Sequence, residues 1–437
     1  MHQVRRHRVS VMLKTLSLNG VGPAEVFGPV EFAPRLNFIT GDNGLGKSFL
    51  LDTAWWVLTR TWARGVAIPQ RDHPHPRIAF TFSKVTAGDK SGEVEFKNGA
   101  WPQPKARPPI PGVVIYAGVD GSFSAWDPER NYWTDKDSSS DEKIRAFNFN
   151  PDQVWYGARS AQGTNICNGL ISDWVTWQLE QDPAFDELCN VLNALSPSGV
   201  EKILPGKPRK LIGPDQTRYP HLKMPYGQDV PLIHASAGMR RIAALAYMLV
   251  WTWNAHKEAS RDRRSKPAKE IIFLIDEVEC HLHPQWQRRI IPALLNVMRV
   301  MTGEEVAVQL IVATHSPLVL ASSEPDFDED RDAVFNIQLE CGKAVVTKEV
   351  WAKQGDVVNW LVSDAFGLAQ ARSVEAEQAI EIAEAWMRGE HGGLPGNLDN
   401  AQKIHDELVR VLPGGDHFWP RWIGSMHVKS VVDGGVQ

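Results

Sequence analysis

The segment 41–48 reads G-x-x-x-x-G-K-S and has the residue types needed to hold a nucleotide phosphate. Its glycines let the backbone turn tightly, so that several N–H groups can point at phosphate oxygens. Lys47 can reach the β- and γ-phosphates, and the Ser48 hydroxyl can bind Mg²⁺. An apolar strand is predicted before this loop (35–40) and a helix after it (46–61), which is the context that the motif requires. The other contacts to ATP are predicted to come from Asn43, Gly44 and Gly46.

Two carboxylates, Asp276 and Glu277, follow the apolar segment 271–275. An uninterrupted apolar run suits a central parallel strand that is covered on both faces. Ligands in open α/β sheets bind at the carboxyl ends of such strands. Asp276 is therefore predicted to hold Mg²⁺ through water, and Glu277 to act as the general base toward the attacking water.

Two further segments could contact the phosphates of a nucleotide. His315 follows the apolar segment 306–313 and is predicted to contact the γ-phosphate. The run H-A-S-A-G-M-R-R opens a strongly helical stretch at 234–241. Ser236 suits a helix N-cap, and the same helix start could present Ser236 and Gly238 to an anion.

In this order, the four motifs resemble those of the ABC ATPase family, whose signature reads L-S-G-G-Q. This chain matches the signature at Ser236 and Gly238 and departs from it at Ala237 and Met239. Residues 276–284 read D-E-V-E-C-H-L-H-P, which is similar to the D-E-P-E-x-H-L-H-P of soluble ATPases of the OLD, RecF and Rad50 kind, with Val278 in place of the usual proline. The resemblance implies an α/β fold: an ABC ATPase head, with a mixed sheet around the P-loop core, a helical lobe and a helical C-terminal tail.

The resemblance also implies a homodimer that ATP closes head to tail. Each ATP would lie between one subunit's P-loop and the other subunit's signature, so Ser236 and Gly238 would act on the partner's ATP. The family further uses a glutamine that touches Mg²⁺ and the attacking water, at the point where the α/β lobe gives way to the helical lobe. Gln153 lies at that point and is the first candidate, with Gln162 as the alternative.

The helical and strand patterns divide the chain into four parts. Residues 1–155 are predicted to form the first part of the ATPase lobe, and 156–228 a helical lobe with a Pro-, Lys- and Arg-rich loop at 205–220. Residues 229–360 complete the ATPase lobe, with a helix at 237–255 and a charged loop at 256–270. Residues 361–437 are predicted to be a helical tail.

Composition limits the functional classes. A net charge of −5 over 437 residues gives no support to a wholly basic nucleic-acid binder. The four cysteines lie far apart, which fits a reducing cytoplasm. No segment has the length and apolar character of a membrane span.

Local clusters leave some interpretations open. The basic runs 202–210 and 257–269 are solvated loops or DNA contacts. The acidic segment 324–330 is a solvated loop or a metal site. The aromatic segment 416–422 is either a partner anchor or part of the chain's own core.

Three functions are compatible with these motifs. In the first, ATP-gated dimerisation controls a separately encoded effector, as in Septu-like anti-phage systems, whose ATPase subunits this chain resembles and whose partner is an HNH nuclease. The second is a RecF-like DNA repair clamp. The third, a transporter subunit, is disfavoured by the His-Leu-His-Pro segment. No intrinsic nuclease is expected, because the sequence after residue 355 is helical in pattern.

Overall fold

Apolar segments from distant parts of the chain form the central sheet of the computed structural model, which describes residues 13–83, 88–102, 112–132, 146–197, 202–302 and 306–433. Among these residues the sheet has eight strands, in the order β18-β17-β3-β16-β15-β6-β7-β8. The strands are β3 (Leu36–Gly41), β6 (Val113–Ala117), β7 (Phe123–Trp126), β8 (Phe147–Phe149), β15 (Glu270–Ile275), β16 (Ala307–Ala313), β17 (Asp332–Glu340) and β18 (Lys343–Glu349). The sheet is mixed, as predicted.

The five strands at its centre, from β17 to β6, run parallel to one another. β7, β8 and β18 pair antiparallel at the two edges. Because the central strands share one direction, the loops that follow β3, β15 and β16 all leave from the same edge of the sheet. The phosphate loop, the Asp276-Glu277 pair and His315 therefore lie at this edge.

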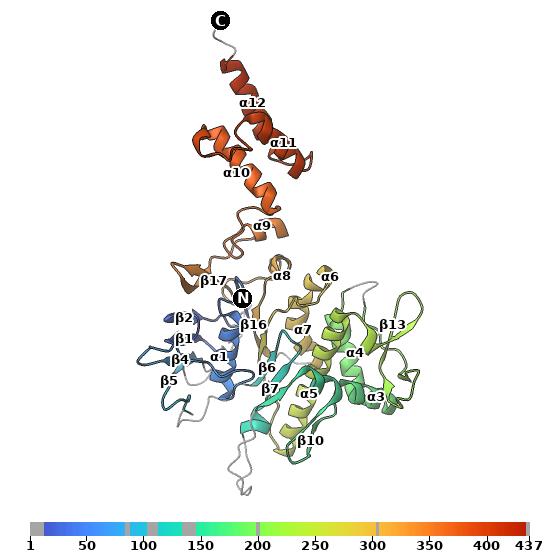
Figure 1. Ribbon diagram of the computed structural model, residues 1–437. Coiled ribbons are helices and arrows are strands. Elements are labelled where there is room, and N and C mark those ends of the chain that lie inside the picture. Colours follow the sequence, from blue (N-terminus) through green and yellow to red (C-terminus); the bar gives the residue numbers. More distant parts are fainter. Residues whose placement is uncertain are drawn as a thin grey trace, which may run out of the picture. The chain divides into compact units, whose positions relative to one another are not determined.

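Helix α1 (Lys47–Thr59) lies between the central sheet and a smaller antiparallel sheet (Figure 1). The smaller sheet contains β1 (Thr15–Asn19), β2 (Val26–Glu31), β4 (Arg77–Phe82) and β5 (Lys90–Glu95), in the order β2-β1-β4-β5. Trp55 and Trp56 of α1 are buried in the core that both sheets share. This burial fixes the helix that begins at the phosphate loop.

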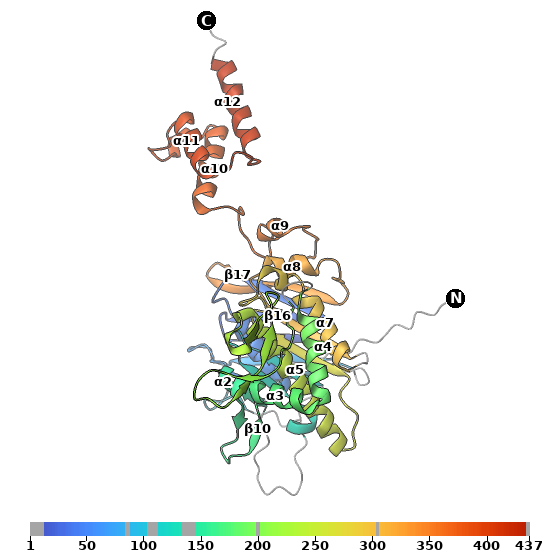
Figure 2. The same cartoon turned by 90° about the vertical axis from the view of Figure 1, so that its right-hand side faces the viewer.

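The second face of the central sheet is covered by helices that share one apolar core. They include α2 (Pro151–Tyr156), α3 (Leu170–Glu180), α4 (Pro183–Leu195), α5 (Ala237–Asp262), α6 (Pro284–Gln287) and α7 (Ile290–Thr302). α4 packs on both α5 and α7 (Figure 2). α8 (Pro317–Ser323) and α9 (Val357–Leu361) pack on each other after the switch segment.

The sequence prediction for the end of α5 is wrong, and the predicted loop 205–220 is interrupted by short strands. α5 continues to Asp262, seven residues beyond the predicted end, because His256 is fully buried and its ring is hydrogen-bonded to Asp127 at 2.8 Å. The predicted loop 205–220 contains paired strands. The strands of this region are β9 (Ala158–Arg159), β10 (Asn165–Cys167), β11 (Arg209–Lys210), β12 (Arg218–Tyr219), β13 (His221–Lys223) and β14 (Asp229–Pro231).

The chain forms two compact units, residues 1–366 and 367–437. The second contains α10 (Val374–Arg388), α11 (Ala401–Val411) and α12 (Trp419–Asp433) around a core of its own. Phe418 and Trp422 are buried in that core, at 4% and 0% exposure. Of the two interpretations of the aromatic segment, the structure therefore supports the chain's own core. No described helix has both the length and the apolar character to span a bilayer.

Candidate functional site

The phosphate loop joins the end of β3 to the start of α1. Gly41, Gly44 and Gly46 adopt positive φ angles of 124°, 80° and 106°, which side chains rarely tolerate. A Cβ atom at Gly41 would lie 2.1 Å from the carbonyl oxygen of Ile337, whereas one at Gly44 would meet nothing within 4 Å. No side chain caps α1 at Gly46. The first N–H groups of the helix are therefore available to an anion, as a phosphate site requires.

Lys47 is 6% exposed and turns back onto the loop. Its Nζ donates hydrogen bonds to the carbonyl oxygens of Gly41 and Asp42, at 2.7 and 2.8 Å. Burial lowers the pKa of Lys47, while the charges of Glu277 and Asp276 act in the opposite direction. The ammonium group thus lies in the field of carboxylates from the end of β15.

The predicted magnesium ligands Ser48 and Asp276 are in direct contact. The Ser48 hydroxyl donates to Oδ1 of Asp276 at 3.1 Å. Asp276 is 1% exposed, and its backbone N–H donates to the carbonyl of Ala117 in the neighbouring strand. These oxygen ligands suit a hard divalent cation.

Arg64 is a site residue that the sequence analysis missed. Its guanidinium donates to Oδ2 of Asp276 at 3.1 Å and to Oδ1 of Asp52 at 3.0 Å, and it also contacts the Tyr116 hydroxyl. Burial opposes its charge, but Tyr116, Asp52 and Asp276 together raise the pKa of Arg64. Arg64 is therefore a fixed positive charge beside the buried Asp276 carboxylate. No spacing motif in the sequence marks it.

Glu277, the predicted general base, has a φ of 48°, in the left-handed region that a non-glycine residue seldom adopts. Its carbonyl oxygen accepts hydrogen bonds from the Cys280 N–H and from Arg241. Arg241, from α5, also donates to the carbonyls of Asp276 and Val119. Arg241, a second residue that the sequence analysis missed, therefore ties α5 to the backbone that carries both carboxylates.

Glu279 holds the switch segment in place. Its carboxylate accepts a hydrogen bond from the Thr314 hydroxyl at 2.7 Å and another from the backbone N–H of His315. Burial and the charge of Lys47 lower the pKa of His315, while the charges of Glu279 and Glu277 act in the opposite direction. The sequence analysis did not assign this role to Glu279, although the second glutamate of the D-E-V-E run could have indicated it.

Ser236 is the N-cap of α5, and its side-chain oxygen accepts the N–H of Met239 at 3.3 Å. The N-cap interpretation is confirmed, and Ser236 is exposed. Gly238 lies against the loop after β15, where a Cβ atom would come within 2.7 Å of the carbonyl oxygen of His281. The action of both residues on a partner's ATP stays a prediction.

The two candidate glutamines lie in different surroundings. Gln153 forms a capping box with Asn150 at the start of α2, and its side-chain oxygen accepts the Asn150 N–H at 3.0 Å. Gln162 lies in the turn between β9 and β10, where its N–H donates to Ser160. The structure shows neither side chain in contact with Ser48 or Asp276, and the assigned role of Gln153 stays a prediction.

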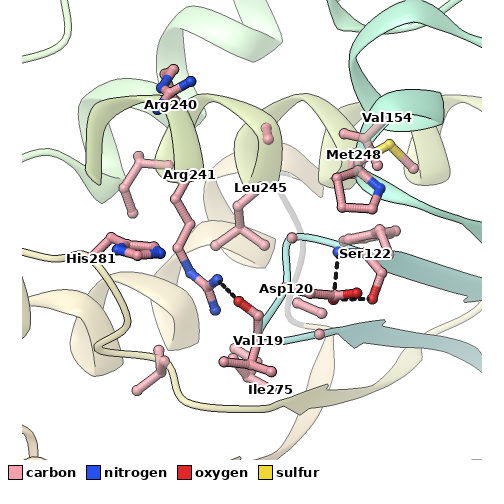
Figure 3. A pocket seen from close by; sticks show the side chains of 18 of the residues that line it. Val119, Asp120, Ser122, Val154, Arg240, Arg241, Leu245, Met248, Ile275 and His281 are labelled. Atoms are coloured by element: carbon pink, nitrogen blue, oxygen red, sulfur yellow. Dashed lines mark hydrogen bonds between the residues drawn. The ribbon is translucent and has the colours of Figure 1, made fainter. Parts of the chain in front are cut away.

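A cavity of about 320 Å³ lies between the β6–β7 turn, α2 and the start of α5. Figure 3 shows Arg241 reaching from α5 toward Val119, and Asp120 bonded to Ser122 in the turn. Ile275, the last residue of β15, also lines the cavity. The cavity thus separates α2 and α5 from the loop that carries Asp276 and Glu277, and Arg241 is the polar link between α5 and that loop.

We expect Glu279→Ala to lower ATP turnover by about 10²-fold, because a misplaced catalytic group commonly costs that much. Glu279→Gln, which keeps an acceptor for the His315 N–H, should retain more activity. Phosphate release under saturating ATP measures both. ATP affinity should change little, since Lys47 and Ser48 are untouched. If the two variants and the wild type turn over ATP at equal rates, Glu279 has no role in the reaction.

Similarities to solved structures are broad but low. The SMC head domain from Thermotoga maritima is 16% identical, with a TM-score of 0.38, and the match covers 78% of this chain and 100% of that chain. The recombination mediator protein RecF bound to ATP is 15% identical, with a TM-score of 0.36, over 80% of this chain and 100% of that chain. Both TM-scores are below 0.5, so these similarities indicate no function for this chain.

Among curated proteins, "Retron Vc95 probable ATPase" from Vibrio cholerae serotype O1 biovar El Tor is 32% identical over 115 residues, 24% of this chain and 19% of that protein. "Septu protein PtuA" from Bacillus thuringiensis is 31% identical over 148 residues, 32% of this chain and 31% of that protein. Each match therefore spans less than a third of the relative. The family model described as "AAA domain, putative AbiEii toxin, Type IV TA system" matches residues 36–321, from β3 through most of α8. Because this range is more than half of the chain and contains the whole site, the protein belongs to the AAA_21 family.

Proposed function

We propose that this chain binds ATP with Mg²⁺ at the edge of the central sheet and hydrolyses it. The observation that carries this proposal is the contact between Ser48 and Asp276 beside the glycine loop, with Lys47 next to them. The residues fit the ligand: the loop has backbone N–H groups for phosphates, and Ser48 and Asp276 have oxygens for Mg²⁺.

The roles follow from chemistry and position. Ser48 and Asp276 would hold Mg²⁺, which supplies positive charge between phosphate oxygens. Lys47 would exchange its two loop carbonyls for phosphate oxygens, a charge-assisted contact. Glu277 would accept the proton of the attacking water. His315, whose backbone is held by Glu279, would donate a hydrogen bond at the γ-phosphate.

The functional unit in this proposal is a head-to-tail homodimer. The exposed start of α5 supports it, because Ser236 and the adjacent N–H groups are open to an anion from outside the chain. ATP binding would draw two subunits together, and hydrolysis would release them.

We further propose that this cycle controls a separately encoded effector, an HNH nuclease, in anti-phage defence in the cytoplasm. The similarity to proteins named Septu PtuA and retron ATPases supports a defence role. Residues 367–437 form a second compact unit with a core of its own, and in this proposal that unit binds the partner. ATP can control a partner only if the partner contacts the two states of the dimer differently. The RecF-like clamp remains an alternative prediction that no specific observation favours.

Lys47→Ala should abolish nucleotide binding, because the positive charge at the phosphates is lost. Glu277→Gln should bind ATP normally and slow turnover by about 10²- to 10⁴-fold, the usual effect of losing a general base. Calorimetric titration with ATP and phosphate-release rates separate the two effects. Wild-type turnover by Glu277→Gln would show that another group is the base.

The shared site can be tested by mixing two inactive subunits. Lys47→Ala removes one half of a site and Ser236→Arg the other, so each heterodimer would regain one intact site. We expect part of the ATPase activity to return in the mixture. Persistent inactivity, in mixtures shown to exchange subunits, would contradict the head-to-tail arrangement.

The chain alone should leave supercoiled plasmid intact with Mg²⁺ or Mn²⁺, because the described residues contain no group of three or more metal-ligating side chains. In the acidic segment, Asp328 instead accepts the N–H of Asp330, and just after the segment Asp332 pairs with Arg35. Agarose gels follow the supercoiled form over time. Metal-dependent cleavage that survives repurification and is lost in an Asp326→Asn and Asp328→Asn variant would overturn the proposal of a separate effector.

A further inference from the structure

The strands β11 and β12 form an exposed ribbon in the helical lobe, and its base is firmly anchored. Gln178 of α3 donates to the carbonyl of Gly206 at 2.9 Å, and Trp174 in turn donates to Gln178. Ile203 and Leu222 at the base are buried in the lobe's core. Beyond this base, residues 212–218 are exposed. The ribbon is therefore a fixed projection.

The ribbon region is basic although the whole chain is acidic. Residues 202–231 contain six basic and two acidic residues, a net charge of +4, against −5 for the whole chain. Both acids are already engaged. Asp229 pairs with Arg209 at 3.1 Å, and Asp215 accepts hydrogen bonds from the Tyr219 hydroxyl and the Thr217 N–H. Neither acid therefore neutralises the other positive charges of the region, which can bind an external anion.

Two of those charges lie side by side on one face of the ribbon. Lys210 and Arg218 are direct partners across the β11–β12 ladder. Like charges directly opposite each other destabilise a strand pair. Lys210 donates to the neutral side chain of Gln216, and within the described residues no carboxylate pairs with either cation. An arrangement that costs stability and lacks a local counter-charge is typical of a site for a polyanion.

Tyrosines are present in the same region, and Tyr219, the ladder partner of Arg209, lies on the opposite face of the ribbon from Lys210 and Arg218. Three of the chain's six tyrosines, Tyr156, Tyr219 and Tyr226, lie in or beside the ribbon region. Tyr156 and Tyr226 are 64% and 63% exposed. The hydrogen bond to Asp215 raises the pKa of Tyr219, and Tyr156 is close enough to contribute to the same shift. Exposed aromatic rings beside cations provide surfaces on which nucleobases can stack.

The second basic run, 257–269, lacks these features. Lys257 pairs with Glu187 at 2.8 Å, and the run contains no aromatic residue. The combination of adjacent unpaired cations and exposed rings matches a chain of phosphates that carries flat bases.

We propose that the ribbon of residues 202–231, together with Tyr156, binds single-stranded nucleic acid. Lys210 and Arg218 contact successive phosphates on one face of the ribbon, and the tyrosines stack on bases of the same strand where it continues around the edge of the ribbon. This surface lies outside the ATP site, and the proposal does not depend on the ATPase function.

The test is fluorescence anisotropy with labelled oligo-dT, oligo-rU and a duplex, each about 30 nucleotides long. Titrations run between about 50 and about 200 mM salt. The full chain should bind single strands more tightly than duplex. Lys210→Glu with Arg218→Glu should weaken binding at least about tenfold, and the paired glutamine substitutions should reduce the salt slope by about 1.4, the value for two lost phosphate contacts. Tyr156→Ala with Tyr226→Ala should cost about tenfold on single strands alone.

The matched control is Arg261→Glu with Lys266→Glu, which makes the same charge change in the second basic run and should leave affinity within about twofold. Thermal melting and ATP turnover of every variant should match the wild type, since none of these residues lies at the nucleotide site. The affinities for oligo-dT and oligo-rU show whether the chain prefers single-stranded DNA or RNA. The proposal is overturned if the full chain binds no strand, if the control loses as much affinity as the ribbon variant, or if duplex binds equally well and the tyrosine variant is unaffected.

Discussion

The buried carboxylate of Asp276 is the point on which the rest of the site depends. It ends the central strand β15 and meets Ser48 from the phosphate loop on one oxygen and Arg64 on the other. An almost fully buried carboxylate is stable only when it is paired and hydrogen-bonded. The phosphate loop, the loop after α1 and β15 are therefore held together by a single carboxyl group, and the arrangement prepares the oxygen atoms that a divalent cation needs.

A second set of contacts connects the Asp276 backbone to α5. Arg241 comes from α5, four to five residues after the exposed start of that helix, and donates to the carbonyls of Asp276 and Glu277. Glu277 adopts a strained backbone conformation, which persists only where neighbouring contacts enforce it. A shift of α5 would therefore alter the position of the proposed base. The cavity beside Arg241 gives the lobe space for such a shift.

The chain also separates chemistry from recognition. The nucleotide site lies at the edge of the central sheet, whereas the basic ribbon lies in the helical lobe and the aromatic segment 416–422 belongs to the core of the second unit. Phe418 and Trp422 have the composition of an interface anchor, yet they are buried among their own helices. Composition describes what a side chain can do, and only packing decides whether its surface is still available.

The sequence by itself determined the parts of this protein that depend on local geometry. The glycine loop before a helix, the apolar strand before two carboxylates and the helix cap at Ser236 each have a short-range physical signal, and the structure contains all three. The parallel direction of β15 followed as well, because its uninterrupted apolar run indicates a parallel strand buried on both faces. These signals were sufficient for the α/β fold and for most of the candidate site.

Only the tertiary structure decided which distant residues meet there. Arg64 reaches Asp276 across 212 positions and Arg241 reaches Val119 across 122, and no local pattern encodes such pairs. A buried partner explains the wrong helix end too: His256 and its bond to Asp127 extend α5 beyond its predicted end. Two short strands also pair within the predicted loop at 205–220. Propensity acts within a few residues, whereas burial and charge pairing act across the fold and override it.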